Sequence, residues 1–252
     1  MITLKSAHEI ELMRRAGKIT AAARAVARDM VKPGVTTQQI DKAVHRFITE
    51  QGAIPSFLHY NGYPASVCVS VNDEIIHGIP GKRVLQEGDI VSVDVGAFIG
   101  GFHGDCAATY ACGQISDQAK KLIEVTQQSF WEGIKMARKG CRVSDIGHAV
   151  QAYVEANGFS VVRDYVGHGV GAKLHEEVRN FGPAGHGPRL LPGMTLAVEP
   201  MVNVGDWQIR VLPDGWTVKT LDGSLAAHYE NTILITEGDA EVLTVTEDGA
   251  YV

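Results

Sequence analysis

The sequence lacks the features that would place the protein in a membrane or on nucleic acid. Its longest apolar runs, such as residues 232–236, fall far short of the roughly 20 residues that span a bilayer. Lys and Arg total 23 against 29 Asp and Glu, which gives a net charge of -6 and an isoelectric point near 5.9. The short apolar runs lead us to expect no membrane association. Because phosphate backbones are usually bound by clustered basic residues, we also expect no DNA partner.

Secretory signals, paired cysteines and interdomain linkers are also missing. The first eleven residues carry charges and show no apolar segment with a cleavage site, so we expect a cytoplasmic protein. The four cysteines have no CxxC spacing and are expected to be free thiols in a reducing compartment. With no Pro- or Ser-rich linker in 252 residues, we predict a single domain over residues 1–252.

Helical patterns occur in two similar pairs. Ser6 and Glu9 have the spacing of a capping box and predict a helix to about Val31, followed by a second over about 37–51. A long helix over about 116–139 and another ending at Asn157 follow later. Seven positions match at a constant offset of 106 residues: Gly34, Ile40, Ala43, Val44, Phe47, Ile48 and Gly52 against Gly140, Ile146, Ala149, Val150, Tyr153, Val154 and Gly158. Two ordinary amphipathic helices would also match, but we favour pseudo-repeats over about 6–110 and 116–236.

Segments of β-forming residues follow each pair of helices. They cover 66–72, 90–98 and 102–110 in the first half and 159–163, 195–202 and 229–236 in the second. This order predicts an α+β fold with mainly antiparallel strands.

Four acidic residues interrupt these apolar segments. Gly100-Gly101 suits a two-residue hairpin turn, and that register places Asp94 opposite Ala107 with Asp105 diagonal to it on the same face. Glu199 and Glu230 each lie in another β-forming stretch. One Asp near a hairpin often only caps a turn or pairs with a lysine, but four buried acids need compensating charge.

Two divalent cations would supply that charge. They bring +4 against the -4 of the carboxylates and leave room for a bridging hydroxide. His168 lies between Gly167 and Gly169, whose lack of side chains allows close approach to the imidazole, and it is a candidate nitrogen ligand. The sequence therefore indicates a dinuclear metal site between the two halves.

The order of these motifs resembles that of type I methionine aminopeptidases over nearly the whole chain. The matching segments are His77-Gly-Ile-Pro80, Asp94, Gly101-Phe-His-Gly-Asp105, Gly167-His-Gly169, His175-Glu176, Glu199-Pro-Met201 and Tyr229-Glu230. The resemblance implies the pita-bread fold, with two pseudo-symmetric αβ halves around a central antiparallel sheet. It also implies a hydrolase that removes the N-terminal initiator methionine of nascent proteins and peptides, with a preference for a small residue after methionine.

Residue roles also come from this resemblance. Asp94 would chelate one metal, Asp105 and Glu230 would bridge both, and His168 and Glu199 would complete the other. Glu199 would also move the proton between the nucleophilic water and the leaving amine. Catalytic and substrate contacts are expected from His77 and His175, and the methionine pocket from Tyr60, Tyr63, Cys68 and Trp216.

Three residues depart from the pattern of many relatives. Leu174 stands where an aromatic residue is frequent, Asn61 where histidine is frequent, and Cys106 where a threonine follows the bridging aspartate. They leave the shape of the pocket and the surroundings of the metals open. The metal itself is also open, because this donor set accepts Co, Mn, Fe or Zn.

Two alternative functions share this fold. An X-Pro aminopeptidase or prolidase would use the same five ligands, but those enzymes carry a large extra N-terminal domain, and Asp94 comes too early in this chain for one. A non-catalytic pita-bread binding protein would have lost metal ligands, whereas all five are present here.

We expect a monomer, and any transient ribosome contact would use the catalytic domain.

Overall fold

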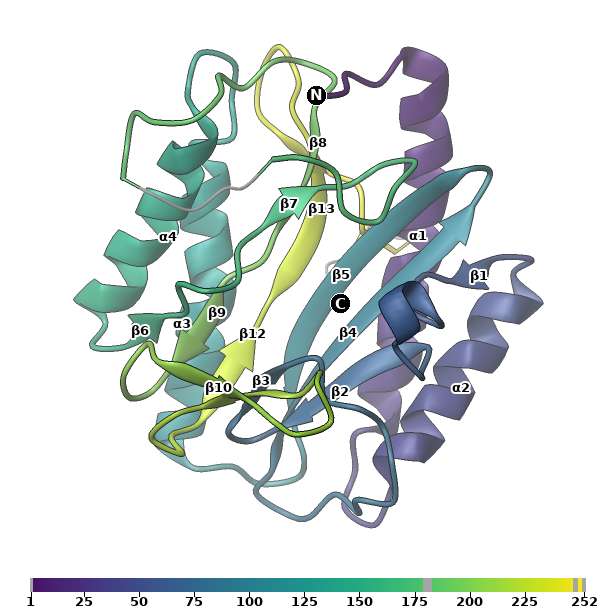
Figure 1. Cartoon of the computed structure of the whole chain (residues 1–252), viewed down its shortest axis with the longest axis vertical. Helices are drawn as coiled ribbons and strands as arrows, with labels where there is room; N and C mark the ends of the chain where they lie inside the picture. The colour runs from purple at the N-terminus through teal and green to yellow at the C-terminus, as the bar shows by residue number, and fades with distance from the viewer. Residues whose placement is uncertain (1, 179–182, 247–248, 251–252) are drawn as a thin grey trace.

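The helices of the structure lie in two pairs. The computed structural model describes residues 2–178, 183–246 and 249–250. The first pair is α1 (Ala7–Met30) and α2 (Thr37–Glu50), and the second is α3 (Asp117–Ile134) and α4 (Val143–Ala156). Figure 1 shows the first pair on the right and the second pair on the left, with α1 passing behind the central strands of a large sheet. Among the described residues, no helix combines the length and apolarity needed to cross a membrane.

Helix boundaries follow local capping chemistry. Ser6 accepts a hydrogen bond from the backbone N–H of Glu9, whose side chain bonds back to the Ser6 N–H, so the predicted capping box is confirmed. The prediction of a helix over about 116–139 was wrong at its C-terminal end, because α3 stops at Ile134. Tight turns follow, with the Met136 N–H bonded to the Gly133 carbonyl and Gly140 at a φ of 97°.

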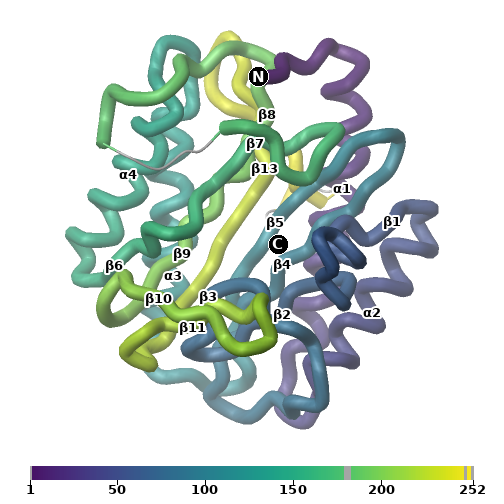
Figure 2. Tube along the Cα trace, in the orientation of Figure 1, coloured from purple at the N-terminus to yellow at the C-terminus, as the bar shows by residue number. Residues whose placement is uncertain are grey.

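The central sheet joins the two halves of the chain. Its strands are β1 (Ile54–Pro55), β2 (Val67–Val71), β4 (Ile90–Ile99), β5 (Phe102–Ala111), β7 (His168–Gly169), β8 (Thr195–Val198), β13 (Glu230–Leu234) and β14 (Glu241–Val242). The main path runs β1-β4-β5-β13-β8-β7, with β2 on β4 and β14 on β13, and every pairing is antiparallel. Figure 2 shows β5 and β13, far apart in the sequence, running side by side. The predicted α+β class is confirmed, while the single-domain and pseudo-repeat boundaries stay predictions.

Two three-stranded sheets lie at one end of the central sheet. One is β10 (Ile209–Val211), β11 (Val218–Thr220) and β3 (Glu74–Ile76), and the other is β12 (Ala226–His228), β9 (Met201–Asn203) and β6 (Ser160–Val161). The prediction of one strand over 195–202 was wrong, because Glu199 and Pro200 separate β8 from β9. Proline has no N–H to continue the ladder, and the chain passes there from the central sheet to a smaller one.

Apolar side chains fill the space between the helices and the sheets. Ala23, Ala27, Ile40, Val44 and Ile48 of α1 and α2 pack against buried valines of β2 and β4. A second cluster packs α3 and α4 against β9 and β12. Most residues of the β4–β5 hairpin are buried, and α1 packs against both of its strands. The polar residues described next lie on this packed hairpin and on the strands beside it.

Candidate metal centre

The β4–β5 hairpin places two carboxylates on one face. Asp94 pairs with Ala107 and Asp105 pairs with Gly96, so the predicted register is confirmed. Directly opposed residues share a face of a sheet, as do residues two apart on one strand. Asp94, Ala107 and Asp105 therefore face the same side.

The strand β13 adds a third carboxylate to this face. Glu230 pairs with Ala107, which makes Asp94, Ala107 and Glu230 one row across three strands. Glu199 lies just beyond β8, at the break before Pro200, and the Tyr229 N–H donates to the Pro200 carbonyl. Both glutamates thus lie where the chain passes between the central sheet and the smaller β12-β9-β6 sheet.

The imidazole of His168 completes this cluster from β7. Its Nε2 is 3.4 Å from Glu199 Oε1 and 3.9 Å from Asp105 Oδ2. Its Nδ1 is 2.8 Å from the Gly169 carbonyl oxygen, an acceptor, so Nδ1 carries the proton and Nε2 keeps its lone pair. Burial lowers the pKa of His168 to about 3, which keeps the ring neutral. A neutral imidazole held by a carbonyl at its other nitrogen is typical of a metal ligand.

The four carboxyl groups are crowded and short of partners. Burial raises the pKa of each of them, that of Asp94 to about 7. Oxygen atoms of Asp94, Asp105 and Glu230 are buried without a hydrogen-bond partner in the described part of the chain. Such a set is costly without cations and offers the oxygen ligands that divalent ions bind. The residues fit a metal centre on their own chemistry.

A cavity of about 320 Å³ opens directly beside the cluster. The sequence-predicted site residues all line it; they are His77, His175, Tyr60, Tyr63, Cys68 and Trp216 together with Asp94, Asp105, His168, Glu199 and Glu230. Leu174, Asn61 and Phe57 also contribute to its wall, and Phe57 was missing from the predicted pocket. Besides the carboxylates, the cavity is therefore lined by aromatic and apolar side chains with a few polar groups, as is usual for a small-ligand site.

Two further histidines lie at the edge of this cavity. His175 Nδ1 is 2.8 Å from the Tyr60 hydroxyl, and its ring centroid is 4.1 Å from that of His168. His77 packs edge-on against Tyr165 and Trp216 and has a φ of 58°, in the left-handed region that a histidine rarely adopts. Burial and the nearby His175 lower the pKa of His77 to about 4. Burial also lowers the pKa of His175, so both rings are neutral hydrogen-bonding groups at neutral pH.

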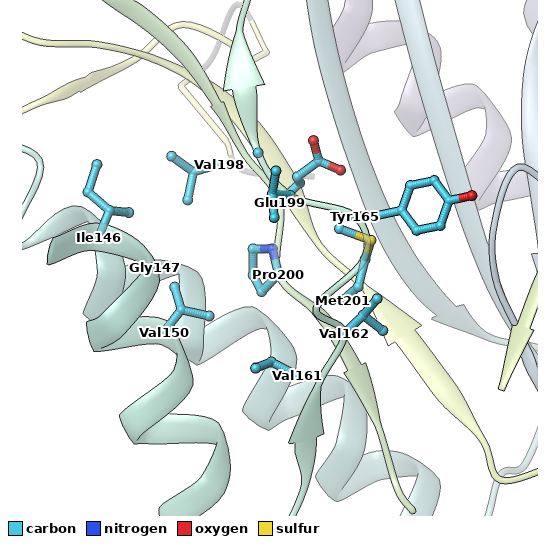
Figure 3. A pocket seen from close by; sticks show the side chains of 12 residues that line it. Ile146, Gly147, Val150, Val161, Val162, Tyr165, Val198, Glu199, Pro200 and Met201 are labelled. Carbon is cyan, nitrogen blue, oxygen red and sulfur yellow. The ribbon is translucent and has the colours of Figure 1, made fainter. Parts of the chain in front are cut away.

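The far side of Glu199 faces a different, smaller cavity. It holds about 40 Å³ and is lined mainly by apolar side chains of α4 and β6 and by residues 198–201. Figure 3 shows the Glu199 carboxylate pointing away from Ile146 and Val150 of α4, while Pro200 lies nearer that helix. These apolar residues therefore surround the backbone of residues 198–201, while the Glu199 carboxylate points toward the carboxylate cluster.

Sequence reasoning missed two buried cationic or potentially cationic residues. Arg24 of α1 is fully buried, and its Nη1 donates to the carbonyl oxygens of Ala107 and Glu230, each at 3.0 Å. His228, at the end of β12, lies 3.7 Å from Glu199 Oε2. A buried arginine within the apolar pattern of α1 and a histidine two residues before Glu230 were the available signals.

The sequence matches a known family of metallopeptidases. The model of metallopeptidase family M24 matches residues 11–237. A methionine aminopeptidase of Clostridium perfringens is 53% identical over 247 residues, which cover 97% of this chain and 99% of the relative. Methionine aminopeptidase 1 of Bacillus subtilis is also 53% identical, over 246 residues, with the same two shares.

Solved structures agree in fold. The crystal structure of methionine aminopeptidase from Thermotoga maritima matches with a TM-score of 0.95 and 48% identity, over 97% of this chain and 99% of that one. Prolidase from Pyrococcus furiosus matches with a TM-score of 0.81 at 21% identity, and only 66% of that chain is covered, so it shows the shared fold alone. The predicted pita-bread fold is confirmed. The chain therefore belongs to metallopeptidase family M24 and, within it, to the methionine aminopeptidases.

Proposed function

We propose that the chain removes the initiator methionine from nascent proteins and peptides and prefers a small residue after it. The observation that carries this proposal is that the candidate metal ligands and the aromatic and apolar side chains line one and the same cavity. Tyr63, Cys68 and Leu174 are buried there, and Trp216 packs edge-on against Tyr63 at 5.1 Å between ring centroids. A flexible thioether side chain fits such an aromatic pocket.

The donor set supports two divalent cations in this centre. Asp94, Asp105, His168, Glu199 and Glu230 would hold them, and Co, Mn, Fe and Zn all suit these ligands. When bound, the cations would polarise the scissile carbonyl and lower the pKa of a bound water. Two groups of possible ligand atoms, Asp105-His168-Glu230 and Asp94-His228-Glu230, have Glu230 in common. This supports the proposal that Glu230 binds both cations.

The side chains around the cavity orient the substrate. His175, whose Nδ1 is paired with the Tyr60 hydroxyl, presents Nε2 as a hydrogen-bonding group for the scissile amide. His77 lies on the same cavity and would contact the residue that follows methionine. Glu199, with a pKa raised by burial, would accept a proton from water and return it to the leaving amine. We further propose that the enzyme works in the cytoplasm as a monomer, with only transient ribosome contact.

Release of free amino acid from Met-Ala-Ser and Ala-Pro-Ser tests this function. The metal-depleted protein would be reconstituted with Mn²⁺ or Co²⁺ before the assay. We expect methionine from the first peptide alone, and a much slower reaction with Met-Leu-Ser. Asp105→Asn should abolish release, while the matched change Asp117→Asn, at an exposed carboxylate on α3, should leave it unchanged. Cleavage of Ala-Pro-Ser would instead favour an X-Pro peptidase, and inactivity with every metal would favour a binding protein.

A further inference from the structure

His228 is a buried imidazole with no assigned role. It ends β12, two residues before Glu230, and its side chain is 1% exposed. Its main-chain N–H donates to the Thr109 hydroxyl, which fixes its backbone against β5. Within the described part of the chain, neither ring nitrogen of His228 has a hydrogen-bond partner. A buried polar group without a partner is unfavourable, so this arrangement indicates a missing ligand.

The Nε2 atom of His228 points into the carboxylate cluster. It lies 3.7 Å from Glu199 Oε2 and 3.8 Å from Glu230 Oε2. Both distances exceed those of a hydrogen bond. Two ligand atoms that each lie about 2.1 Å from one cation are separated by about 3.0 Å when they subtend a right angle, by about 3.4 Å at a tetrahedral angle, and by more at wider angles. The spacing therefore fits two ligands of one ion better than a direct contact.

The potential ligand atoms form two groups rather than one. Asp105, His168 and Glu230 make one group, and Asp94, His228 and Glu230 make the other, with the atoms of each group within 4.8 Å of one another. The two groups share Glu230, and each contains one imidazole. We infer that His228 is a direct ligand of the cation held by Asp94 and Glu230, so that each of the two cations has its own histidine. This inference rests on the proposed metal-dependent function and adds a ligand to it.

A second imidazole changes which metals the centre prefers. Nitrogen donors raise affinity for Co²⁺ and Zn²⁺ more than for Mn²⁺, which favours oxygen ligands. If Asp94 and Glu230 were joined only by water, that position would be an all-oxygen site. With His228 bound, we expect the ratio of Co²⁺ affinity to Mn²⁺ affinity at both positions to be higher than at an all-oxygen position.

Paramagnetically shifted proton resonances of the Co²⁺-loaded enzyme test this assignment directly. A histidine bound through Nε2 keeps its Nδ1 proton, which gives an exchangeable shifted signal, so wild type loaded with two Co²⁺ should show two of them. The variant H228Q should show one, and its second Co²⁺ should bind at least about 10-fold more weakly, with a smaller loss for Mn²⁺. The matched variant H45Q, on α2 and bonded to Ser66, should keep both signals and both affinities.

The possible outcomes separate this inference from the proposed function. A single shifted histidine signal in wild type with two Co²⁺ bound would overturn the inference, whether or not the variant folds. Two signals retained in H228Q would also overturn it. If wild type releases methionine and D105N does not, the proposed function stands in either case. Failure of wild type to bind any divalent cation would remove both.

Discussion

A buried ion pair ties the N-terminal segment to the histidine beside the cavity. Lys5 Nζ pairs with Glu176 Oε2, and the two side chains are 2% and 14% exposed. Their positions are fixed by the backbone, because the Lys5 N–H donates to Gly193 and the Glu176 N–H donates to Gly169, next to His168. We expect this pair to contribute measurably to stability, unlike most surface pairs.

The change Lys5→Met removes the cation and leaves the carboxylate of Glu176 largely out of water. Breaking a buried pair in this way costs about 3–5 kcal/mol, and the remaining exposure of Glu176 places the loss near 3 kcal/mol. Urea unfolding at pH 7 would measure it, provided that the dependence on urea concentration stays constant. Since Glu176 follows His175, we also expect slower methionine release at unchanged metal affinity.

A double-mutant cycle with Glu176→Gln isolates the interaction itself. We expect a coupling free energy of about 2 kcal/mol, within the range for directly contacting residues. The exposed pair Lys139–Glu237, with side chains 54% and 72% exposed, is the matched control, and its cycle should give a much smaller coupling. A Lys5–Glu176 coupling below about 0.5 kcal/mol would refute the reasoning, because the pair would then behave as a solvated one.

Three further changes test other parts of the centre. Burial raises the pKa of Asp94 to about 7, so its neutral form stabilises the metal-free protein below the unfolded pKa of about 4, and this stability is lost as pH rises through 7. In urea unfolding between pH 5 and pH 8, the free energy of unfolding of D94N should therefore fall by about 2.5 kcal/mol less than that of wild type. Parallel pH profiles of the two proteins would contradict this. In G104A, the new Cβ would lie 2.7 Å from Thr20 Oγ1, so thermal unfolding should show a loss of about 1–3 kcal/mol, and an unchanged melting temperature would show that α1 can shift. Y60F removes the hydroxyl paired with His175 and should lower kcat/KM for Met-Ala-Ser about fivefold with metal affinity unchanged, whereas equal rates would exclude a role for that contact.

The hairpin carboxylates were predictable because local chemistry determines their register. A Gly-Gly turn sets the pairing of β4 with β5, and the pairing alone brings Asp94 and Asp105 to one face. The change of sheet after Glu199 was not predictable in the same way. Pro200 argues against one continuous strand over 195–202, but only tertiary pairing shows that the chain passes there to another sheet.

Arg24 and His228 escaped prediction for a similar reason. Each stands in an apolar segment where one polar residue is usually turned toward solvent. Their burial results from contacts with distant parts of the chain: Arg24 with the carbonyls of Ala107 and Glu230, and His228 through the pairing of β12 with β9. Periodicity alone carries no information on such contacts.

The position of β13 in the central sheet has a consequence for folding. This strand comes late in the sequence yet lies in the middle of the sheet, between β5 and β8. Until it inserts, β5 and β8 have unpaired edges, which in a growing chain are open to pairing with other molecules. The same insertion brings Glu230 to Asp94 and Asp105. Insertion of β13 therefore closes the sheet and assembles the site together, and we expect chains that stop before β13 to aggregate rather than fold.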